Sequence, residues 1–235
     1  MNFLAGKKLV NLVLVNVSRR LGLRRSLGRP FFMLIDPCNF CNLRCPLCIS
    51  VLEKGNFGEG FMPIALYREA LEYFGPYLTH LNLYNWGEPF LNKHIYEMIR
   101  LAKGYDIHVT ISSNLNAGEP AEIVDSGLDV LVCSLDGATQ ATYEKYRVKG
   151  NLERALARAR QIVRLRKEKG VSKPLLIWQY LLFEHNKDEL EMARGLAEQG
   201  GFDNFVSGPG HVWVEHPVIK PVSGELSRNE KGSLQ

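Results

Sequence analysis

The sequence predicts an α/β protein whose parallel strands form a partial, TIM-like (β/α)6 barrel. Six short runs rich in β-branched and aromatic residues recur along the chain, and helical patterns fill the intervals between them. The runs are nearly continuously apolar, which is typical of strands that are covered on both faces of a parallel sheet. Because strands and helices alternate, right-handed crossovers connect the strands, and six such units indicate an open barrel.

The expected strands and helices follow one another in strict order along the chain. The six strand runs are 31–36, 80–85, 108–114, 130–136, 175–183 and 204–208. The helical patterns between them are 63–75, 92–103, 119–126, 151–169 and 186–199. The first pattern has Pro63 near its start and Gly75 at its end, which are the residue types favoured at the two ends of a helix. Apolar residues of the fourth pattern recur at helical spacing with arginines on the opposite face.

Three segments are expected in the domain organisation. Residues 1–29 form a basic amphipathic extension, residues 30–216 form the barrel, and residues 217–235 form a polar, flexible tail. Three residues near the tail, His211, Trp213 and His216, are expected in core or loop positions, with substrate contact as the alternative.

The N-terminal extension carries an apolar run at residues 9–17 between basic residues. Asn11 and Asn16 interrupt this run, which is far shorter than the ~20 apolar residues of a membrane-spanning helix. We expect a helix packed on the body of the protein. A helix resting on an anionic membrane surface and a cleaved signal peptide are the alternatives.

The composition is that of an ordinary globular protein, with 46% hydrophobic and 23% charged residues in a chain of 235. A net charge of +4 is mild and gives no argument for a nucleic-acid partner. Five cysteines are too few for a disulfide scaffold, and four of them lie within residues 38–48. This clustering indicates metal binding in a reducing compartment, so we expect a cytoplasmic protein.

Polar motifs follow the first four expected strands. They are "CNFCNLRCPLC" after the first, "NWGEP" after the second, "SSN" closing the third and "SLDG" closing the fourth. Function gathers at the carboxyl ends of the strands in parallel α/β folds. The sequence therefore predicts one functional site on this rim.

The clustered cysteines Cys38, Cys41, Cys45 and Cys48 allow several kinds of site. Disulfides are disfavoured, because no other cysteine-rich region or secretory signal accompanies the cluster. Two C-x2-C pairs are compatible with zinc, but only three residues separate them, whereas zinc sites usually combine distant pairs. The spacing also differs from the ferredoxin run C-x2-C-x2-C-x3-C-P. The remaining possibility is C-x3-C-x2-C from Cys41. Cys38 is then expected to be a loop residue, with a redox or alternative-ligand role as the alternative, and Cys133 is expected to be a small buried hydrophobic residue.

The stretch "CNLRCPLC" resembles the signature of the radical S-adenosylmethionine (radical SAM) enzymes, and "WGEP" after the second strand makes this resemblance specific. It covers residues 31 to about 205. The resemblance implies that Cys41, Cys45 and Cys48 ligate a [4Fe–4S] cluster whose fourth iron binds S-adenosylmethionine. Reduction then yields a 5′-deoxyadenosyl radical that abstracts hydrogen from a substrate. Leu43 in the cluster loop is expected to shield the cluster from water.

The same resemblance assigns S-adenosylmethionine contacts on the rim. "NWGEP" is similar to the family's GGEP motif, which contacts the methionine amino group, although Trp86 replaces the first glycine. The motif residues implied are Trp86, Gly87, Glu88 and Pro89.

Further rim residues are implied around the same ligand. Ser113, Asn114 and Ser134 are candidates for the methionyl carboxylate or the ribose. Asp136 either orients its loop or approaches the substrate, and Arg147 pairs either with the ligand's carboxylate or in a surface ion pair. Gln179 is a weaker candidate, facing either the barrel or a helix interface.

Residues 147–173 are strongly basic. We expect a solvated outer face, and the alternative is a docking patch for an acidic reductant of the flavodoxin or ferredoxin type. A nucleic-acid role is not expected, because aromatic residues are not interleaved with the charges.

The region after the fourth strand most resembles radical SAM proteins with a C-terminal SPASM or twitch extension, although no cysteine follows Cys133. The substrate expected for that group is a peptide or protein side chain or a small metabolite. An activating enzyme that makes a glycyl radical on a partner protein is the alternative. A non-catalytic iron–sulfur or zinc module is the alternative of another class.

Overall fold

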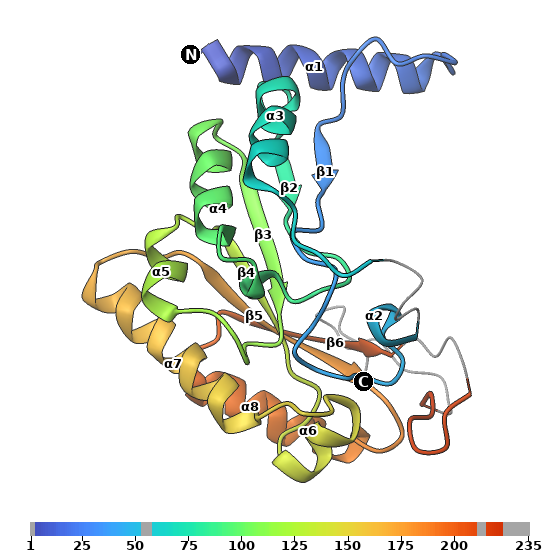
Figure 1. The fold of residues 1–235 in the computed structure, drawn as a ribbon, viewed down its shortest axis with the longest axis vertical. Coiled ribbons are helices and arrows are strands. Elements are labelled where there is room, and N and C mark those ends of the chain that lie inside the picture. Colours follow the sequence, from blue (N-terminus) through green and yellow to red (C-terminus); the bar gives the residue numbers. More distant parts are fainter. Residues whose placement is uncertain (1–2, 53–57, 211–214, 223–235) are drawn as a thin grey trace.

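A single parallel sheet organises the computed structural model, which describes residues 3–52, 58–210 and 215–222 (Figure 1). Its strands lie side by side in chain order, and each neighbouring pair is parallel. The strands are β1 (Phe32–Leu34), β2 (His80–Asn82), β3 (His108–Ser113), β4 (Val130–Ser134), β5 (Leu175–Leu182) and β6 (Asn204–Pro209). Since β1 and β6 do not pair in the described sheet, the barrel is open, and the predicted α/β fold is confirmed.

Helices connect the strands at the expected places. They are α1 (Phe3–Arg20), α2 (Ile49–Leu52), α3 (Ile64–Phe74), α4 (Ile95–Gly104), α5 (Pro120–Asp125), α6 (Gln140–Tyr146), α7 (Leu152–Glu168) and α8 (Leu190–Gly200), with 3-10 turns at Pro89–Leu91 and Lys187–Glu189. The sequence did not indicate α2 or α6. Seven residues give α6 too few turns to show a period, and the Thr139 side chain caps it by accepting from the Thr142 N–H.

The two faces of the sheet differ in burial. In β3, Val109, Ile111 and Ser113 are buried, whereas the residues that alternate with them are half-exposed. The buried residues pack with the helices in one continuous core, while the other face lines the open barrel. The expectation that both faces are covered was therefore wrong. The side chains of a strand such as β3 alternate between the buried core on one face and the partly exposed interior of the barrel on the other.

A second, smaller cluster lies under the cysteine-bearing loop. It joins Leu43, Cys45, Leu47, Tyr146, Phe183 and Ile219. Ile219 belongs to the segment predicted as a flexible tail, yet it is only 1% exposed. The Lys220 carbonyl also accepts from the Glu184 N–H at 3.1 Å. The described part of the tail thus packs on the loop, while residues 223–235 lie outside the described ranges.

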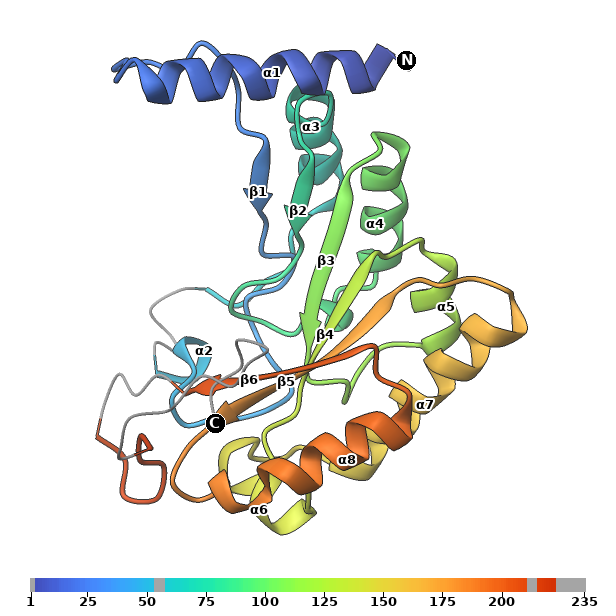
Figure 2. The same cartoon turned by 180° about the vertical axis from the view of Figure 1, so that it is seen from behind.

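Helix α1 lies across the end of the sheet opposite the carboxyl rim (Figures 1 and 2). It contacts the body near α4, where the Lys8 ammonium donates to the Tyr105 and Asp106 carbonyls, directly after that helix ends. Of the helices in the described ranges, none combines the length and apolar character that crossing a bilayer demands.

Candidate active site

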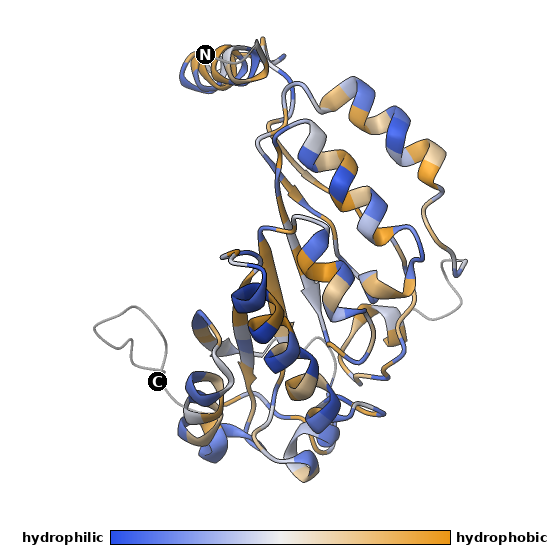
Figure 3. Ribbon diagram, turned by 90° about the vertical axis from the view of Figure 1, so that its left-hand side faces the viewer, coloured by the Kyte–Doolittle hydropathy of each residue, from blue (hydrophilic) through white to orange (hydrophobic). Residues whose placement is uncertain are grey.

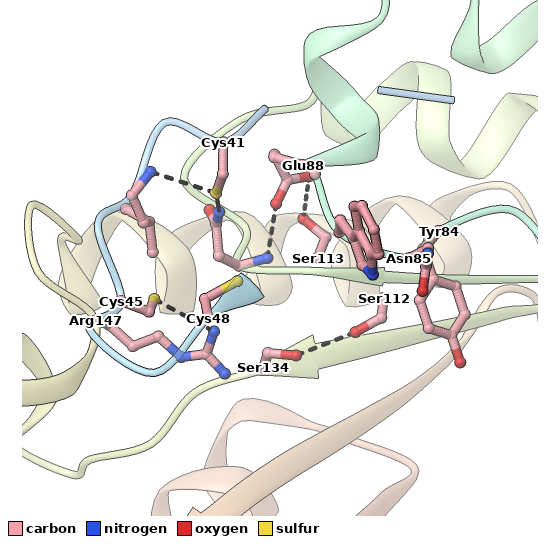
Figure 4. A pocket seen from close by; sticks show the side chains of 14 residues that line it. Cys41, Cys45, Cys48, Tyr84, Asn85, Glu88, Ser112, Ser113, Ser134 and Arg147 are labelled. Atoms are coloured by element: carbon pink, nitrogen blue, oxygen red, sulfur yellow. Dashed lines mark hydrogen bonds between the residues drawn. The ribbon is translucent and has the colours of Figure 1, made fainter. Parts of the chain in front are cut away.

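A cavity of about 140 Å³ opens at the carboxyl rim of the sheet, between the loop after β1 and the ends of β2, β3 and β4 (Figure 4). Most of its lining comes from the motifs singled out in the sequence. The lining residues are Cys41, Leu43, Cys45, Cys48, Tyr84, Asn85, Trp86, Gly87, Glu88, Ser112, Ser113, Asn114, Ser134 and Arg147. Of the implied S-adenosylmethionine contacts, Pro89, Asp136 and the weaker candidate Gln179 are outside this lining.

Three of the four clustered thiols border the cavity. A turn closed by the Cys48 N–H and the Cys45 carbonyl, 3.0 Å apart, places Cys45 and Cys48 near each other, and Cys41 lies across the loop. Among the residues that the structure describes, no three His, Cys, Asp or Glu side chains converge on one ion. Thiols spread around a shared cavity fit a multi-iron cluster better than a single tetrahedral metal.

Cys38 is separated from this group. Its side chain is 1% exposed, and its thiol donates to the Phe40 carbonyl at 3.2 Å instead of lining the cavity. The residue also forms an isolated antiparallel bridge with Phe61. Cys38 is therefore a structural part of the loop in this geometry.

The environment of the thiols favours their protonated forms in the cluster-free chain. Burial raises the pKa of Cys41 to about 12 and that of Cys38 to about 11. Burial also raises the pKa of Cys45, against the opposing effect of the Arg147 charge. Since metal ligands must be thiolates, loading this site has to release protons.

Gly87 lies against the backbone of the cysteine loop. A Cβ atom at this position would lie 1.8 Å from the Cys38 carbonyl oxygen and 2.7 Å from that of Phe40. The neighbouring Glu88 N–H donates to the same Phe40 carbonyl at 2.9 Å. Only glycine allows this approach, so the motif after β2 directly braces the loop that carries the cysteines.

The Glu88 carboxylate is buried and ties β2 to the end of β3. Its Oε1 accepts from the Ser113 hydroxyl at 2.9 Å, and its Oε2 accepts from the Asn114 N–H at 2.9 Å. Burial raises the pKa of Glu88 to about 7, although these hydrogen bonds lower it. Glu88 also caps the 3-10 turn that Pro89 begins, by accepting from the Phe90 N–H.

The turn before Glu88 is held by Asp36, which the sequence analysis missed. Asp36 Oδ2 accepts from the Trp86 N–H at 3.2 Å, while its buried Oδ1 has no hydrogen-bond partner in the described part of the chain. Burial raises the pKa of Asp36. Its place directly after β1, at the predicted rim, was the signal that could have found it.

Asn114 connects the end of β3 to the cysteine loop. Its Nδ2 lies 3.5 Å from the Cys41 sulfur and 3.0 Å from Asn42 Oδ1. Its Oδ1 accepts from the Asn116 N–H, so the amide orientation is fixed. Asn114 is thus placed to donate a hydrogen bond to a Cys41 thiolate.

Hydroxyl groups line the cavity floor where β3 meets β4. The Ser112 and Ser134 hydroxyl oxygens are 3.1 Å apart, and Ser134 also donates to Gln179 Oε1 at 3.4 Å. Gln179 thus lies beside Ser134 on the barrel face of the sheet and not at a helix interface. Both serines are open to the cavity, whereas Ser113 is occupied by Glu88.

Arg147 is part of a buried ion pair behind the cysteines. Its Nε donates to Asp136 Oδ2 at 2.6 Å, and Nη1 lies 3.8 Å from the Cys45 sulfur. Burial opposes the charge on Arg147, but Asp136 and Cys45 together raise its pKa well above the ordinary value. The other Asp136 oxygen accepts from the Leu181 N–H. Asp136 therefore positions Arg147, which is not in a surface ion pair.

Part of the basic stretch 147–173 is engaged in ion pairs. Arg166 is buried and pairs with Asp203 at 2.6 Å. Lys169 and Lys173 pair with Asp125 and Asp129. These contacts fix the outer helices to the strand ends and reduce the charge left for a docking patch.

The model of the Radical SAM superfamily matches residues 35–197, more than half of the chain. The chain belongs to the radical SAM superfamily. Members of this superfamily are enzymes, and their cofactors are a [4Fe–4S] cluster and S-adenosylmethionine. The predicted family and cofactors are therefore confirmed.

A curated relative of this radical SAM chain is the pre-heme d1 synthase of Dinoroseobacter shibae. The two are 28% identical over 169 residues, which cover 70% of this chain and 40% of the relative. The chain thus spans less than half the length of this relative.

Solved radical SAM structures share the fold. SuiB of Streptococcus suis bound to S-adenosylmethionine matches with a TM-score of 0.67 and 14% identity, over 91% of this chain and 47% of SuiB. Methylornithine synthase matches with a TM-score of 0.57 and 15% identity, over 89% of this chain and 61% of that protein. At these identities the likeness establishes the fold alone.

Proposed function

We propose that this chain cleaves S-adenosylmethionine reductively at a [4Fe–4S] cluster held by Cys41, Cys45 and Cys48, and uses the resulting radical to abstract hydrogen from a substrate. The observation that carries the proposal is the shared cavity, which the thiols of Cys41, Cys45 and Cys48 line together with the Glu88 motif. When bound, the cluster supplies the electron and an open iron position for the methionine end of the ligand.

The residues beside the thiols control charge in the site. Arg147 lies 3.8 Å from the Cys45 sulfur and Asn114 donates toward Cys41, so both stabilise the thiolate forms. Leu43 is buried on the same loop and excludes water from that side. These contacts favour cluster assembly despite the raised thiol pKa values.

Glu88 and its neighbours form the S-adenosylmethionine side of the cavity. An ionised Glu88 provides the negative charge that an ammonium group requires, and Ser113 and Asn114 keep the carboxylate in place. Trp86 and Gly87 offer backbone contacts, while Ser134 and the adjacent Ser112 offer hydroxyls to the carboxylate or ribose. Pro89 stiffens the turn, and Asp136 acts through Arg147.

The substrate lies in the open barrel beside this cavity. A peptide or protein side chain and a small metabolite both remain in the proposal. SuiB is known bound to its precursor peptide SuiA, whereas the Dinoroseobacter shibae relative is named a pre-heme d1 synthase. The electron comes from a flavodoxin or ferredoxin-type reductant, and the segment after β4 favours the SPASM or twitch group.

Production of 5′-deoxyadenosine tests the proposal. The chain is reconstituted anaerobically with iron and sulfide, reduced with dithionite and incubated with S-adenosylmethionine. We expect 5′-deoxyadenosine from the native chain and from Cys38→Ala, and none from the single alanine variants of Cys41, Cys45 and Cys48. A fully loaded native chain that yields no 5′-deoxyadenosine contradicts the proposal, and one zinc per isolated chain favours a non-catalytic module.

A further inference from the structure

Three polar side chains of helix α1, those of Lys8, Asn11 and Ser18, turn toward the body of the protein. Lys8 is buried, and its ammonium donates to the Tyr105 and Asp106 carbonyls at 2.6 and 2.7 Å. Asn11 exchanges two hydrogen bonds with the backbone of Arg29, and the Ser18 hydroxyl accepts from the Leu27 N–H at 2.8 Å. Polar contacts therefore fix the helix and the loop that follows it.

The exposed side of α1 carries an apolar stripe. Leu9, Val10, Val13 and Val17 recur at helical spacing and are between 37% and 59% exposed. The following loop adds Leu21, Leu23 and Leu27, all exposed. In Figure 3, α1 lies at the end of the molecule marked N, with orange hydrophobic residues between blue hydrophilic ones. An ordinary surface helix turns its apolar stripe to the core, whereas the most exposed apolar residues of α1 form a stripe on its outer side.

The charge around this apolar stripe has one sign. Every charged residue before Asp36 is basic, namely Lys7, Lys8, Arg19, Arg20, Arg24, Arg25 and Arg29. The four arginines from Arg19 to Arg25 are exposed beside the stripe. An apolar stripe flanked by cationic side chains matches the interface of an anionic bilayer, where the stripe enters the acyl boundary and the arginines meet phosphates.

We propose that α1 and residues 21–27 bind the surface of an anionic phospholipid membrane, with the helix lying in the interface plane. A second copy of this chain is a less suitable partner for the apolar stripe, because packing two such faces together would bring their arginines close to one another. Since α1 lies at the end of the sheet opposite the rim, a membrane-bound chain keeps the cysteine-lined cavity turned away from the lipid (Figure 2).

Vesicle flotation of the whole chain tests the inference. The probes are vesicles of phosphatidylcholine alone and of phosphatidylcholine with about 40% phosphatidylglycerol. We expect flotation with the anionic vesicles only, and release when the salt is raised from about 0.1 to about 0.5 M. Equal binding to both vesicles, or no binding to either, overturns the proposal.

A pair of variants locates the binding face. Val10→Glu with Val13→Glu places two acidic groups on the stripe and is expected to lower the bound fraction at least about tenfold. Leu66→Glu with Met192→Glu is the matched control, because these exposed residues lie on α3 and α8 and the added charge is equal. An equal loss of the vesicle-bound fraction in both double variants contradicts the proposal. A stable dimer of the native chain that is dissociated only by the double variant on α1 contradicts it as well. Circular dichroism confirms that each variant is folded.

Discussion

Gly87 is the residue at which the motif after β2 meets the cysteine loop. Because a Cβ would lie 1.8 Å from the Cys38 carbonyl oxygen, Gly87→Ala must displace either the motif after β2 or the loop that carries the cysteines. We expect the variant to bind less than about half of the native iron on reconstitution, with a loss of about 2 kcal/mol or more in the free energy of unfolding. Iron analysis and urea denaturation measure the two effects.

Gly195→Ala provides the matched control for this change. Gly195 lies inside α8, and a Cβ there meets nothing within 4 Å. We expect native iron binding and a gain of about 0.5–1 kcal/mol in the free energy of unfolding, since alanine favours the helix. Native iron binding by Gly87→Ala would disprove the bracing role of Gly87.

Glu88 makes stability depend on pH. Burial raises its pKa to about 7 from an ordinary 4.5, so between these values the native state binds more protons than the unfolded chain. The free energy of unfolding must then fall as pH rises through this window, by about 3 kcal/mol in all. Urea denaturation of the cluster-free chain from about pH 5 to about pH 8 measures the effect.

The comparison with Glu88→Gln isolates this contribution. The glutamine does not titrate, so the difference between native chain and variant should change over the window, while other groups cancel. A difference that is independent of pH would show that Glu88 has an ordinary pKa.

The functional residues that belong to a local sequence motif could be predicted from the sequence. Those whose role depends on contacts with distant parts of the chain could not. The spacing of Cys41, Cys45 and Cys48 is local, so it could be read from the chain. Asp36 and Ile219 have no local signature, because their partners, the Trp86 N–H and the cluster under the cysteine loop, are distant in sequence. The partner of Arg147 was equally hidden, since it depends on the turn after α6.

At the scale of elements, Asp129 joins β3, helix α4 and the segment before β5 at the amino end of the sheet. Its carboxylate is 1% exposed and accepts from the Val109 N–H and from the Lys103 and Lys173 ammonium groups. Burial raises the pKa of Asp129, but these donors outweigh burial and hold it below its usual value. We expect Asp129→Asn to lower the free energy of unfolding by about 3 kcal/mol, as measured by urea denaturation.

An exposed ion pair supplies the control for Asp129. Asp125 pairs with Lys169, and both side chains are more than a third exposed. Asp125→Asn should therefore cost less than about 1 kcal/mol. Equal losses in the two variants would rule out a special contribution from burial at Asp129.

The order of elements could be predicted because hydrophobic runs and helical periods alternate clearly along the chain. Short elements could not: α2 and α6 have too few turns to show a period. The burial of the two sheet faces was also misjudged, because an apolar lumen residue and an apolar core residue look alike in sequence. The strands that the runs predict at 31–36 and 80–85 are shorter in the structure, where polar rim residues such as Asp36 leave the ladder.

At the scale of the whole molecule, the two proposed functions occupy opposite ends of one sheet. The carboxyl rim gathers the thiols and the Glu88 motif, and the amino end supports α1 (Figures 1 and 2). The open barrel lies between them, with its half-exposed lumen next to the cavity. This arrangement keeps radical chemistry and membrane contact on separate surfaces, so each can be tested without disturbing the other.

The central claim is that three thiolates hold a [4Fe–4S] cluster and leave one iron for S-adenosylmethionine. Its most direct test is the electron paramagnetic resonance spectrum of the dithionite-reduced, reconstituted chain with and without S-adenosylmethionine, recorded for the native chain and for Cys38→Ala. We predict a reduced [4Fe–4S] signal in both proteins whose g values shift when S-adenosylmethionine is added. A signal that is lost in Cys38→Ala, or that S-adenosylmethionine leaves unchanged in the native chain, would contradict the claim.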